Sequence, residues 1–231
     1  MRRILAIETS GRIGSIALAD QGCLLAESQF PHGLKHAAHI VSIIDELCRR
    51  HDWTPGHIEC VCVSAGPGSF TGLRIGVTLA KTLALATGAR VVAVPSVRVL
   101  VENAPPEARC VAIVLDAKRE QIYTALFVRD ASSGEWTPIE PAHVDRLADV
   151  LARAPRPVHL LGEGLPYHRQ AIDGSDPSIV LLPEDSWRAR ASVVARLGWA
   201  MAQRGQFADP YALTPIYIRP PEAEEKWRPP E

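Results

Sequence analysis

The sequence predicts an α/β fold of two related domains, and three observations support this. Short apolar runs typical of buried strands alternate with helical patterns of apolar residues. The order in the first half is β-β-β-α-β-α-β-α, which is typical of layered α/β architectures. Residues 111–116, followed by the alternating residues 122–128, restart that order. We interpret the restart as a weak internal duplication.

Five apolar runs in the first half predict strands, because each is short and bounded by Gly, Pro or small polar residues: residues 4–8, 15–19, 23–29, 60–63 and 91–94. Helical periodicity predicts one helix over residues 36–50, with Arg49 and Arg50 favourable at its C-terminal end. A glycine-rich loop over residues 65–72 opens a second helix that ends at Gly88. A third helix begins near Ser96.

Pro105 and Pro106 mark the expected domain boundary, because tandem prolines interrupt helices and favour extended linkers. The domains are therefore expected to be residues 1–103 and 104–231, with a C-terminal tail that packs back on the first domain. Four further elements are predicted in the second domain: a helix over residues 144–152, strands over 158–161 and 179–182, and a helix over 191–203.

Composition narrows the function classes. The chain has 231 residues, 47% of them hydrophobic and 22% charged, with a net charge of −1. These values are typical of globular proteins, and they argue against a stand-alone nucleic-acid binder, which normally carries a surplus of Lys and Arg. Five cysteines in or beside apolar runs favour a reducing compartment. With no signal-peptide or membrane-span pattern, we expect a cytoplasmic protein without membrane attachment.

One stretch carries most of the motif information. Gly66 and Gly68 allow backbone angles that other residues avoid, and Ser69 or Thr71 can cap the helix that follows. Such a turn could hold a phosphate, but it lacks the ending of a P-loop and the spacing of a dinucleotide-binding fingerprint. From these features alone, a tight strand-to-helix turn is the favoured alternative.

The sequence resembles the TsaB (YeaZ) family, the dimerisation subunits of the bacterial machinery that makes threonylcarbamoyladenosine in tRNA. Four segments carry the resemblance: ILAIETS at 4–10, GPGSFTGLRIG at 66–76, DAKREQIY at 116–123, and PIYIR at 215–219 followed by Lys226 and Trp227. The family motif proper comprises Gly66, Pro67, Gly68, Ser69, Phe70, Thr71, Gly72 and Arg74. The resemblance implies the actin/Hsp70-like (ASKHA) fold, in agreement with the predicted element order.

The resemblance also implies a function. The expected role is a non-catalytic scaffold that binds a TsaD-type catalytic subunit and is required for threonylcarbamoylation of adenosine 37 in tRNAs that read codons beginning with A. The implied partners are TsaD, the ATPase TsaE through the complex, a second copy when the chain is alone, and tRNA only within the complex. No cofactor is expected to bind this chain tightly, and ATP and metal are expected on the partner subunits. The alternative is an ATP-dependent or metal-dependent enzyme of the same superfamily, such as a glycopeptidase-like hydrolase.

Candidate sites for chemistry are few. The related TsaD holds a metal through a His-x-x-x-His pair, whereas this chain has His36, His39 and Ile40 in the corresponding helix, so we expect neither metal ligands nor catalytic residues. Glu8 and Asp116 follow the first strand of each half, where members of this fold place groups around nucleotide and magnesium. We interpret them as a possible vestigial nucleotide cleft, with a working cleft as the alternative.

Helical spacing and the resemblance together predict a partner surface. Gly72, Gly76 and Ala80 recur every four residues and form a stripe of small side chains, and the helix before it has two adjoining apolar lines. Spacing alone allows both sets to be core, while TsaB-type proteins pair through these two helices. The expected interface residues are Ile40, Ile43, Ile44, Leu47, Gly72, Leu73, Gly76, Val77 and Ala80.

Overall fold

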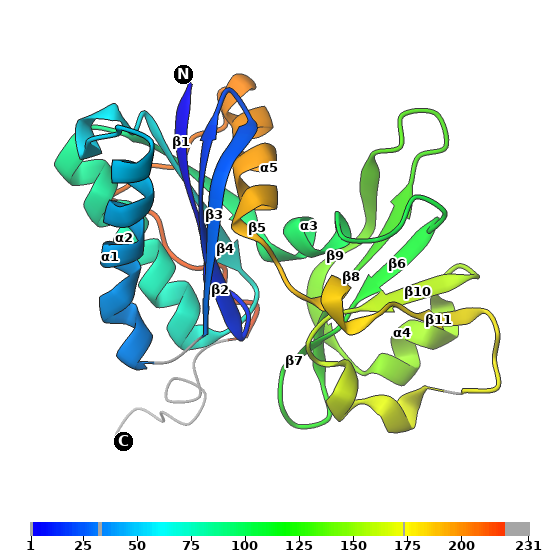
Figure 1. The fold of residues 1–231 in the computed structure, drawn as a ribbon. Helices are drawn as coiled ribbons and strands as arrows, with labels where there is room; N and C mark the ends of the chain where they lie inside the picture. The colour runs from blue at the N-terminus through cyan, green and yellow to red at the C-terminus, as the bar shows by residue number, and fades with distance from the viewer. Residues whose placement is uncertain (1, 32–33, 173, 220–231) are drawn as a thin grey trace.

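Two mixed sheets form the frame of the computed structural model, which describes residues 2–31, 34–172 and 174–219, with side chains omitted for 34–38. The first sheet has the order β3-β2-β1-β4-β5 (Figure 1). Its strands are β1 (Arg3–Glu8), β2 (Ile13–Asp20), β3 (Cys23–Pro31), β4 (Cys60–Gly66) and β5 (Arg90–Pro95). Strand β1 is antiparallel to β2 and parallel to β4. All five strands predicted for this half are therefore confirmed.

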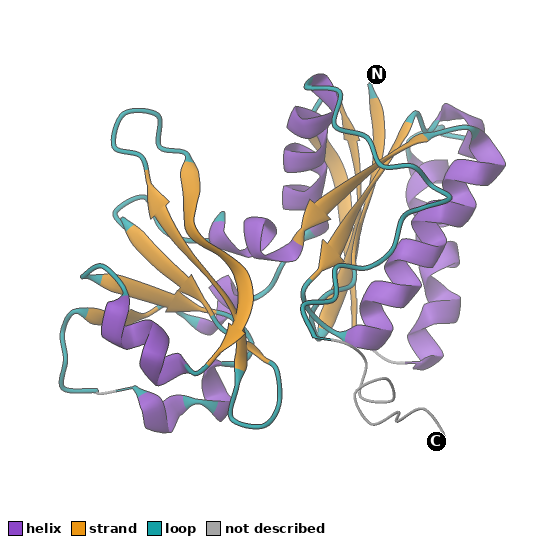
Figure 2. Ribbon diagram, turned by 180° about the vertical axis from the view of Figure 1, so that it is seen from behind, coloured by secondary structure: helices purple, strands orange, loops and turns teal. Residues whose placement is uncertain are grey.

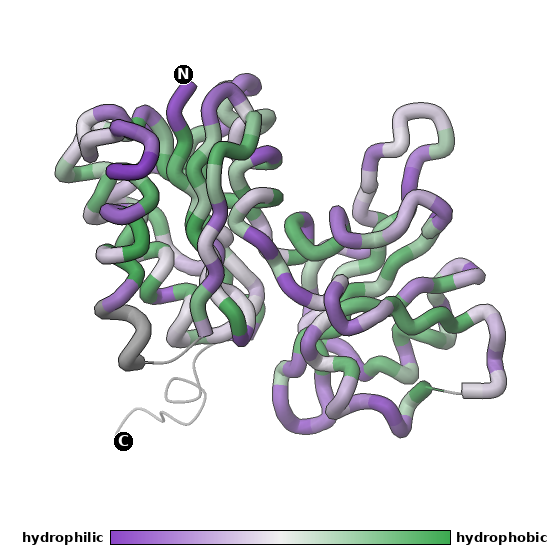
Figure 3. Tube along the Cα trace, viewed as in Figure 1, coloured by the Kyte–Doolittle hydropathy of each residue, from purple (hydrophilic) through white to green (hydrophobic). Residues whose placement is uncertain are grey.

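Helices cover both faces of the first sheet. Helices α1 (Leu34–Arg50) and α2 (Phe70–Thr87) lie on one face, and α5 (Ala191–Gln203) lies on the other (Figures 1 and 2). Strand periodicity explains the two layers, because successive side chains point to opposite faces. Leu5 and Ile7 belong to the core beneath α1 and α2, whereas Ile4 and Ala6 belong to the core beneath α5. Figure 3 shows the apolar segments gathered along the strands of both sheets.

The second sheet repeats the topology of the first. It contains β6 (Cys110–Ile113), β7 (Leu115–Asp116), β8 (Ile122–Arg129), β9 (Trp136–Asp145), β10 (Val158–Leu161) and β11 (Ile179–Leu181). Strand β8 is antiparallel to β6 and β9, and β10 is parallel to β6 and β11. Apart from the two-residue β7, which pairs with β8, the order β9-β8-β6-β10-β11 thus matches β3-β2-β1-β4-β5 strand for strand. The internal duplication and the two-domain actin-like fold predicted from the sequence are confirmed.

The duplication is incomplete in its helices. Helix α4 (Leu147–Arg153) occupies the place of α1, but only two short 3-10 turns, Leu165–Tyr167 and Arg169–Ala171, stand where α2 would be. The short α3 (Ser96–Val101) leads from the first sheet into the second. Within the described residues, α2 is the helix of the first half without a helical counterpart in the second.

Strand β9 was not predicted from the sequence, whereas the helix predicted over 144–152 is observed as α4, which begins three residues later. The strand contains Pro138 and Pro141, and prolines argue against a central strand because they cannot donate to the ladder. Strand β9 lies at the edge of its sheet, pairing with β8 through two register irregularities. The prolines are tolerated at the edge, and α4 begins only at Leu147.

Helix α5 departs from the predicted domain division. It was assigned to the second domain, yet it packs against β1 and β2 of the first sheet. Its N-terminus is tied to the same sheet: the Ser192 backbone N–H donates to Glu27 Oε1 at 3.0 Å, and the Ala191 N–H donates to Ser15 Oγ at 2.8 Å. Beyond α5, residues 208–217 also return to the first domain, where Ile216 N donates to Ala65 O at 2.7 Å. The first domain is therefore discontinuous in sequence.

No helix of the described residues combines the length and the apolar character needed to cross a membrane.

Close packing of α5 on the first sheet predicts a sensitive position. A Cβ added to Gly198 would lie 2.4 Å from Cys62 Sγ and 2.7 Å from Cys62 Cβ. We expect Gly198→Ala to lower the free energy of unfolding by about 1–3 kcal/mol, because the helix must move away from the strand. Urea denaturation measures the change. Gly56→Ala is the matched control, since a Cβ there meets no atom within 4 Å; equal losses in both variants would contradict the packing.

Candidate functional site

A cleft of about 680 Å³ lies where the two domains face each other. Residues from both halves line it: Ser10, Gly11, Arg12, Gly68, Ser69 and Phe70 from the first, and Leu115, Asp116, Ala117, Lys118, Tyr123, Glu163 and Tyr167 from the second. The volume is in the range of small-molecule sites. Because it lies at the carboxyl ends of β1 and β4 in the first sheet, and of β10 in the second, its position is that of a ligand site in α/β folds.

Two related Gly-x-Gly loops shape this cleft. In the first half, a Cβ on Gly68 would lie 2.5 Å from Ser10 O, and Ser69 N donates to that same oxygen at 2.7 Å. In the second half, a Cβ on Gly164 would lie 2.6 Å from Asp116 N. Only glycine permits backbone approach this close. Each loop therefore presses on the segment that follows the first strand of its own sheet.

Glu8 does not line the cleft, contrary to the expected pairing of Glu8 with Asp116. It is fully buried behind Ser10, whose backbone N–H donates to Glu8 Oε1 at 2.5 Å. Its Oε2 atom has no hydrogen-bond partner among the described residues. Burial raises the pKa of the Glu8 carboxyl, while hydrogen bonds from Ser10 and Ser64 oppose the shift. The carboxyl is thus part of the domain interior, because β1 ends beneath the loop that carries Ser10.

Asp116 does line the cleft and is already paired. Its Oδ2 atom accepts from Lys118 Nζ at 2.7 Å, and its Oδ1 atom lies 3.4 Å from His168 Nε2. Burial alone would raise the pKa of Asp116, but the hydrogen bonds from Lys118 and His168 hold it below its ordinary value. The Asp116 carboxylate therefore remains charged and is paired with these two side chains.

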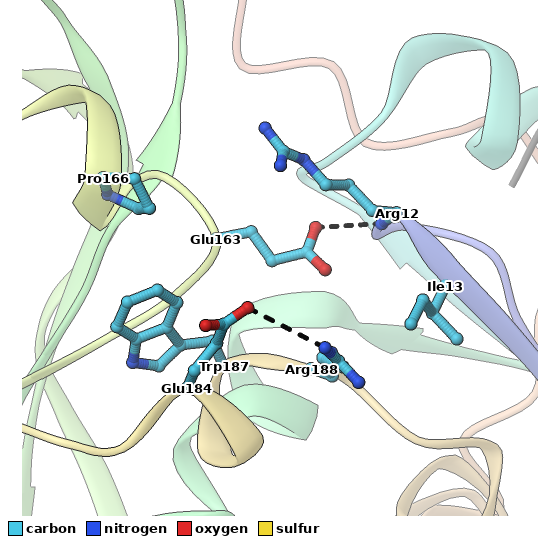
Figure 4. Close-up of a pocket in the computed structure, with 7 residues that line it drawn as sticks. All are labelled: Arg12, Ile13, Glu163, Pro166, Glu184, Trp187 and Arg188. Atoms are coloured by element: carbon cyan, nitrogen blue, oxygen red, sulfur yellow. Dashed lines mark hydrogen bonds and ion pairs between the residues drawn. The ribbon is translucent and has the colours of Figure 1, made fainter. Parts of the chain in front are cut away.

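Arg12 and Glu163 connect the two domains. The Arg12 backbone N–H donates to Glu163 Oε2 at 2.9 Å, and the Arg12 guanidinium donates to the hydroxyl of Tyr167. Burial raises the pKa of Glu163, with the charges of Arg12 and Arg188 acting in the opposite direction. Figure 4 shows the Glu163 side chain directed into a smaller pocket of about 180 Å³, next to Glu184 and Arg188, with the Arg12 guanidinium turned away from it.

The remaining motif residues divide between capping, packing and a surface cluster. Ser69 is the N-cap of α2, with its side chain accepting from Gly72 N at 3.3 Å, and Gly88 ends the helix in the left-handed conformation at φ 76°, as predicted. Pro67 and Gly72 are buried, whereas Phe70, Thr71 and Arg74 are exposed. Arg74 lies over the Phe70 ring at 3.9 Å from its centroid and donates from Nε to the Tyr217 hydroxyl at 2.9 Å.

The predicted interface residues require correction. Ile40, Ile44, Leu47, Gly72, Leu73, Gly76, Val77 and Ala80 are buried in the first domain itself, and Ile43 is half-buried. The small stripe faces β1, because a Cβ on Gly76 would lie 2.3 Å from Thr9 Oγ1 and 3.5 Å from an Ile7 methyl carbon. The stripe serves the approach of α2 to its own sheet. Contact of these two helices with a partner stays a prediction, and their outward faces are the ones available for it.

Metal binding would require a cluster of His, Cys, Asp or Glu among the described side chains. These contain no group of three or more His, Cys, Asp or Glu residues arranged to hold a metal ion. His39 is exposed, and the side chain of His36 lies outside the described residues.

Arg12, Glu163 and Tyr167 were not predicted as site residues from the sequence, and Tyr217 was noted only as part of the PIYIR segment at 215–219. Arg12 lies 151 residues from Glu163 and 155 from Tyr167, and Arg74 lies 143 from Tyr217. No local spacing predicts contacts over such separations. The one available signal was the recurrence of a Gly-x-Gly loop at 66–68 and 162–164 after corresponding strands.

Comparison with known proteins defines the class. The family model described as TsaD, tRNA N6-adenosine threonylcarbamoyltransferase, matches residues 33–168. A threonylcarbamoyltransferase of Desulfovibrio desulfuricans is 35% identical over 101 residues, which cover 37% of this chain and 28% of that protein. The chain is thus related to proteins of tRNA threonylcarbamoyladenosine formation.

Similarity over the whole length then selects one family. The threonylcarbamoyladenosine biosynthesis protein TsaB of Bacillus subtilis is 34% identical over 230 residues, 97% of each chain. The TsaB of Escherichia coli is 30% identical over 137 residues, 58% of each chain. The structure of YeaZ from Pseudomonas aeruginosa matches the fold with a TM-score of 0.78 at 23% identity, covering 94% of this chain and all of that one. The chain belongs to the TsaB (YeaZ) family and takes part in threonylcarbamoyladenosine biosynthesis.

The buried carboxyl predicts a pH-dependent variant. The folded state favours protonated Glu8, so its contribution to stability is complete below the ordinary pKa of 4.5 and is lost as pH rises through the folded value. Glu8→Gln cannot ionise, and its Oε1 atom can still accept from Ser10. We therefore expect it to stabilise the protein at pH 7 by on the order of 1 kcal/mol, with the gain vanishing in acid.

Thermal melting between pH 4 and pH 8 checks this expectation, with Glu107→Gln as the control at an exposed position. A Glu8→Gln variant less stable than the wild type at pH 7 would show that the carboxylate is stabilised in the folded state.

Proposed function

We propose that this chain is a non-catalytic scaffold that binds and activates a TsaD-type subunit for threonylcarbamoylation of adenosine 37 in tRNAs that read codons beginning with A. The observation that carries the proposal is the 34% identity with a TsaB protein over 97% of both chains. The cleft supports it further. Asp116 is paired with Lys118 and His168, and Glu163 accepts from Arg12, so these acids are engaged within the protein. An acid held in such pairs is poorly placed to activate a substrate.

The proposed complex divides the chemistry among its subunits. The TsaD-type subunit performs the transfer, an ATPase of the TsaE type joins through the complex, and ATP and metal reside on those partners. This chain holds no cofactor tightly and forms a homodimer when alone. A TsaD-type partner would be related to this chain, because the family model described as TsaD matches residues 33–168 here.

The outward face of α2 is the best candidate for the partner surface. From residue 75 to residue 87 its sequence has a single charged residue, Lys81, whose Nζ atom donates to Leu213 O at 3.1 Å. Thr78, Thr82 and Leu85 are exposed on the same helix, and Leu85 retains 50% of its accessible surface. Exposed helix faces are normally rich in charge, so an uncharged face indicates contact with another protein.

Complementation tests the function. In cells depleted of their own TsaB, expression of this chain should restore threonylcarbamoyladenosine in tRNA digests measured by mass spectrometry. The double variant Glu8→Gln, Asp116→Asn should restore it within a few fold, because neither acid has a catalytic role in this proposal. Loss of a transition-state interaction would instead cost on the order of a hundredfold. Absence of restoration by the folded wild type would contradict the pathway assignment. A hundredfold loss in the double variant would support the enzymatic alternative.

Charge on the α2 face should prevent assembly. We expect Thr78→Arg and Leu85→Glu to weaken binding to a TsaD-type subunit by at least roughly 30-fold, equivalent to about 2 kcal/mol, because each buries an unpaired charge. Calorimetry measures the affinity, and gel filtration reports the homodimer. Ala152→Arg on α4 is the matched control, since Ala152 is exposed on the second domain. Unchanged affinity in both α2 variants would place the interface on another surface.

A further inference from the structure

Two arginines, one that lines the cleft and one that packs on a cleft-lining ring, have similar environments. Arg12 donates to the Tyr167 hydroxyl and lies 5.3 Å from the centroid of the Tyr167 ring. Arg74 donates to the Tyr217 hydroxyl and lies over Phe70. Among the described residues, no carboxylate lies within ion-pair distance of either guanidinium. Aromatic side chains therefore hold both cations in place, and neither has an ion-pair partner within the described part of the chain.

The two pairs belong to one continuous surface. Arg12, Tyr167 and Phe70 all line the cleft, and Arg74 packs on the outer side of Phe70. The Phe70 and Tyr217 rings contact each other, with centroids 5.4 Å apart. The rings remain accessible, with 59% of Tyr167, 40% of Phe70 and 37% of Tyr217 exposed. We call these five residues the Arg/Tyr surface: Arg12, Phe70, Arg74, Tyr167 and Tyr217.

The neighbouring acids that the structure describes form no ion pair with either guanidinium group, although the charges of Arg12 and Glu163 attract each other. Asp116 is neutralised by Lys118 at 2.7 Å, and Glu163 accepts from the Arg12 backbone N–H while its side chain points to the smaller pocket (Figure 4). The chain as a whole has a net charge of −1, so attraction of an anion is a local property of this surface. Such a surface binds polyanions weakly and with a strong dependence on salt.

Unpaired guanidinium groups beside accessible rings suit one class of ligand. Arginine binds phosphate oxygens in a bidentate manner, and aromatic faces stack on unpaired bases. Bases of a duplex are already stacked and paired, so this combination favours single-stranded RNA over double-stranded RNA. Arginine and tyrosine are also common at protein interfaces, which makes a protein partner the competing occupant.

We propose that the Arg/Tyr surface binds the single-stranded loop of the RNA substrate, with Arg12 and Arg74 on phosphates and with Tyr167 and Phe70 stacking on bases. This rests on the proposed function, in which the complex acts on an adenosine of tRNA. It adds a direct RNA contact by this chain to the scaffold role.

Salt-dependent binding of a fluorescein-labelled anticodon stem–loop RNA tests the proposal. Fluorescence anisotropy is measured with the chain alone and with the chain assembled with a TsaD-type subunit. Each phosphate contact to a single strand contributes about 0.7 to the slope of log K against log salt concentration. We expect Arg12→Gln and Arg74→Gln each to lower the magnitude of the slope by about that amount. Tyr167→Leu should weaken binding roughly 5- to 150-fold through lost stacking.

Arg90→Gln is the matched control. Arg90 is exposed and lies over the Phe207 ring at 4.0 Å, so its replacement removes the same charge from a similar stack outside the cleft. This variant should keep the wild-type slope. A blunt RNA duplex of equal length should bind more weakly than the stem–loop.

Three outcomes would overturn the proposal. Equal slopes for the wild type and the double variant Arg12→Gln, Arg74→Gln would exclude the phosphate contacts, as would absence of RNA binding by the wild type in both formats. Unchanged RNA binding with lost affinity for the TsaD-type subunit would assign the surface to a protein partner. In each case, the complementation experiment with the wild type still tests the proposed function, because it measures threonylcarbamoyladenosine in tRNA rather than RNA binding. If no complex assembles, the anisotropy measured with the chain alone decides whether the surface binds RNA.

Discussion

The close approach of two glycine-containing loops to the strands beneath them is the constraint on which the cleft depends. Gly68 rests on the Ser10 carbonyl, and Gly164 rests on the backbone N–H of Asp116. A side chain at either position would push the loop away from the backbone beneath it. Because Ser69 follows Gly68 directly, the same contact fixes where α2 begins. The positions of Arg12 and Phe70 in the cleft follow from these backbone contacts.

Duplication and divergence explain how the two halves differ in use. Both sheets have the same strand order, but only the first retains a full helix after its fourth strand. This helix, α2, buries its small residues against β1 and presents threonines and Leu85 outward. The second half has short turns there, and these carry Tyr167 into the cleft. One position in the repeat thus supplies a long helix in one domain and a cleft-lining aromatic residue in the other.

Much of the fold could be predicted from the sequence because its signals are local. The apolar strands of the first sheet, the Ser69 cap and the Gly88 stop depend on side chains a few residues apart. Strand β9 was missed because Pro138 and Pro141 are acceptable only at a sheet edge, and edge position is a property of the assembled sheet. Helix α5 was found with its observed bounds, but its place on the first sheet depends on the fit of Gly198 against Cys62.

The sequence by itself determined the family, the two-domain architecture and the glycine motif, since these follow from residue order and composition. The tertiary structure decided which side chains are accessible and which charges are compensated. It buried Glu8, paired Asp116 with Lys118, and turned the small stripe of α2 toward its own sheet. It also joined Arg12 to Tyr167 and Arg74 to Tyr217 across more than half of the chain. Burial and pairing depend on contacts between distant segments, which no local pattern encodes.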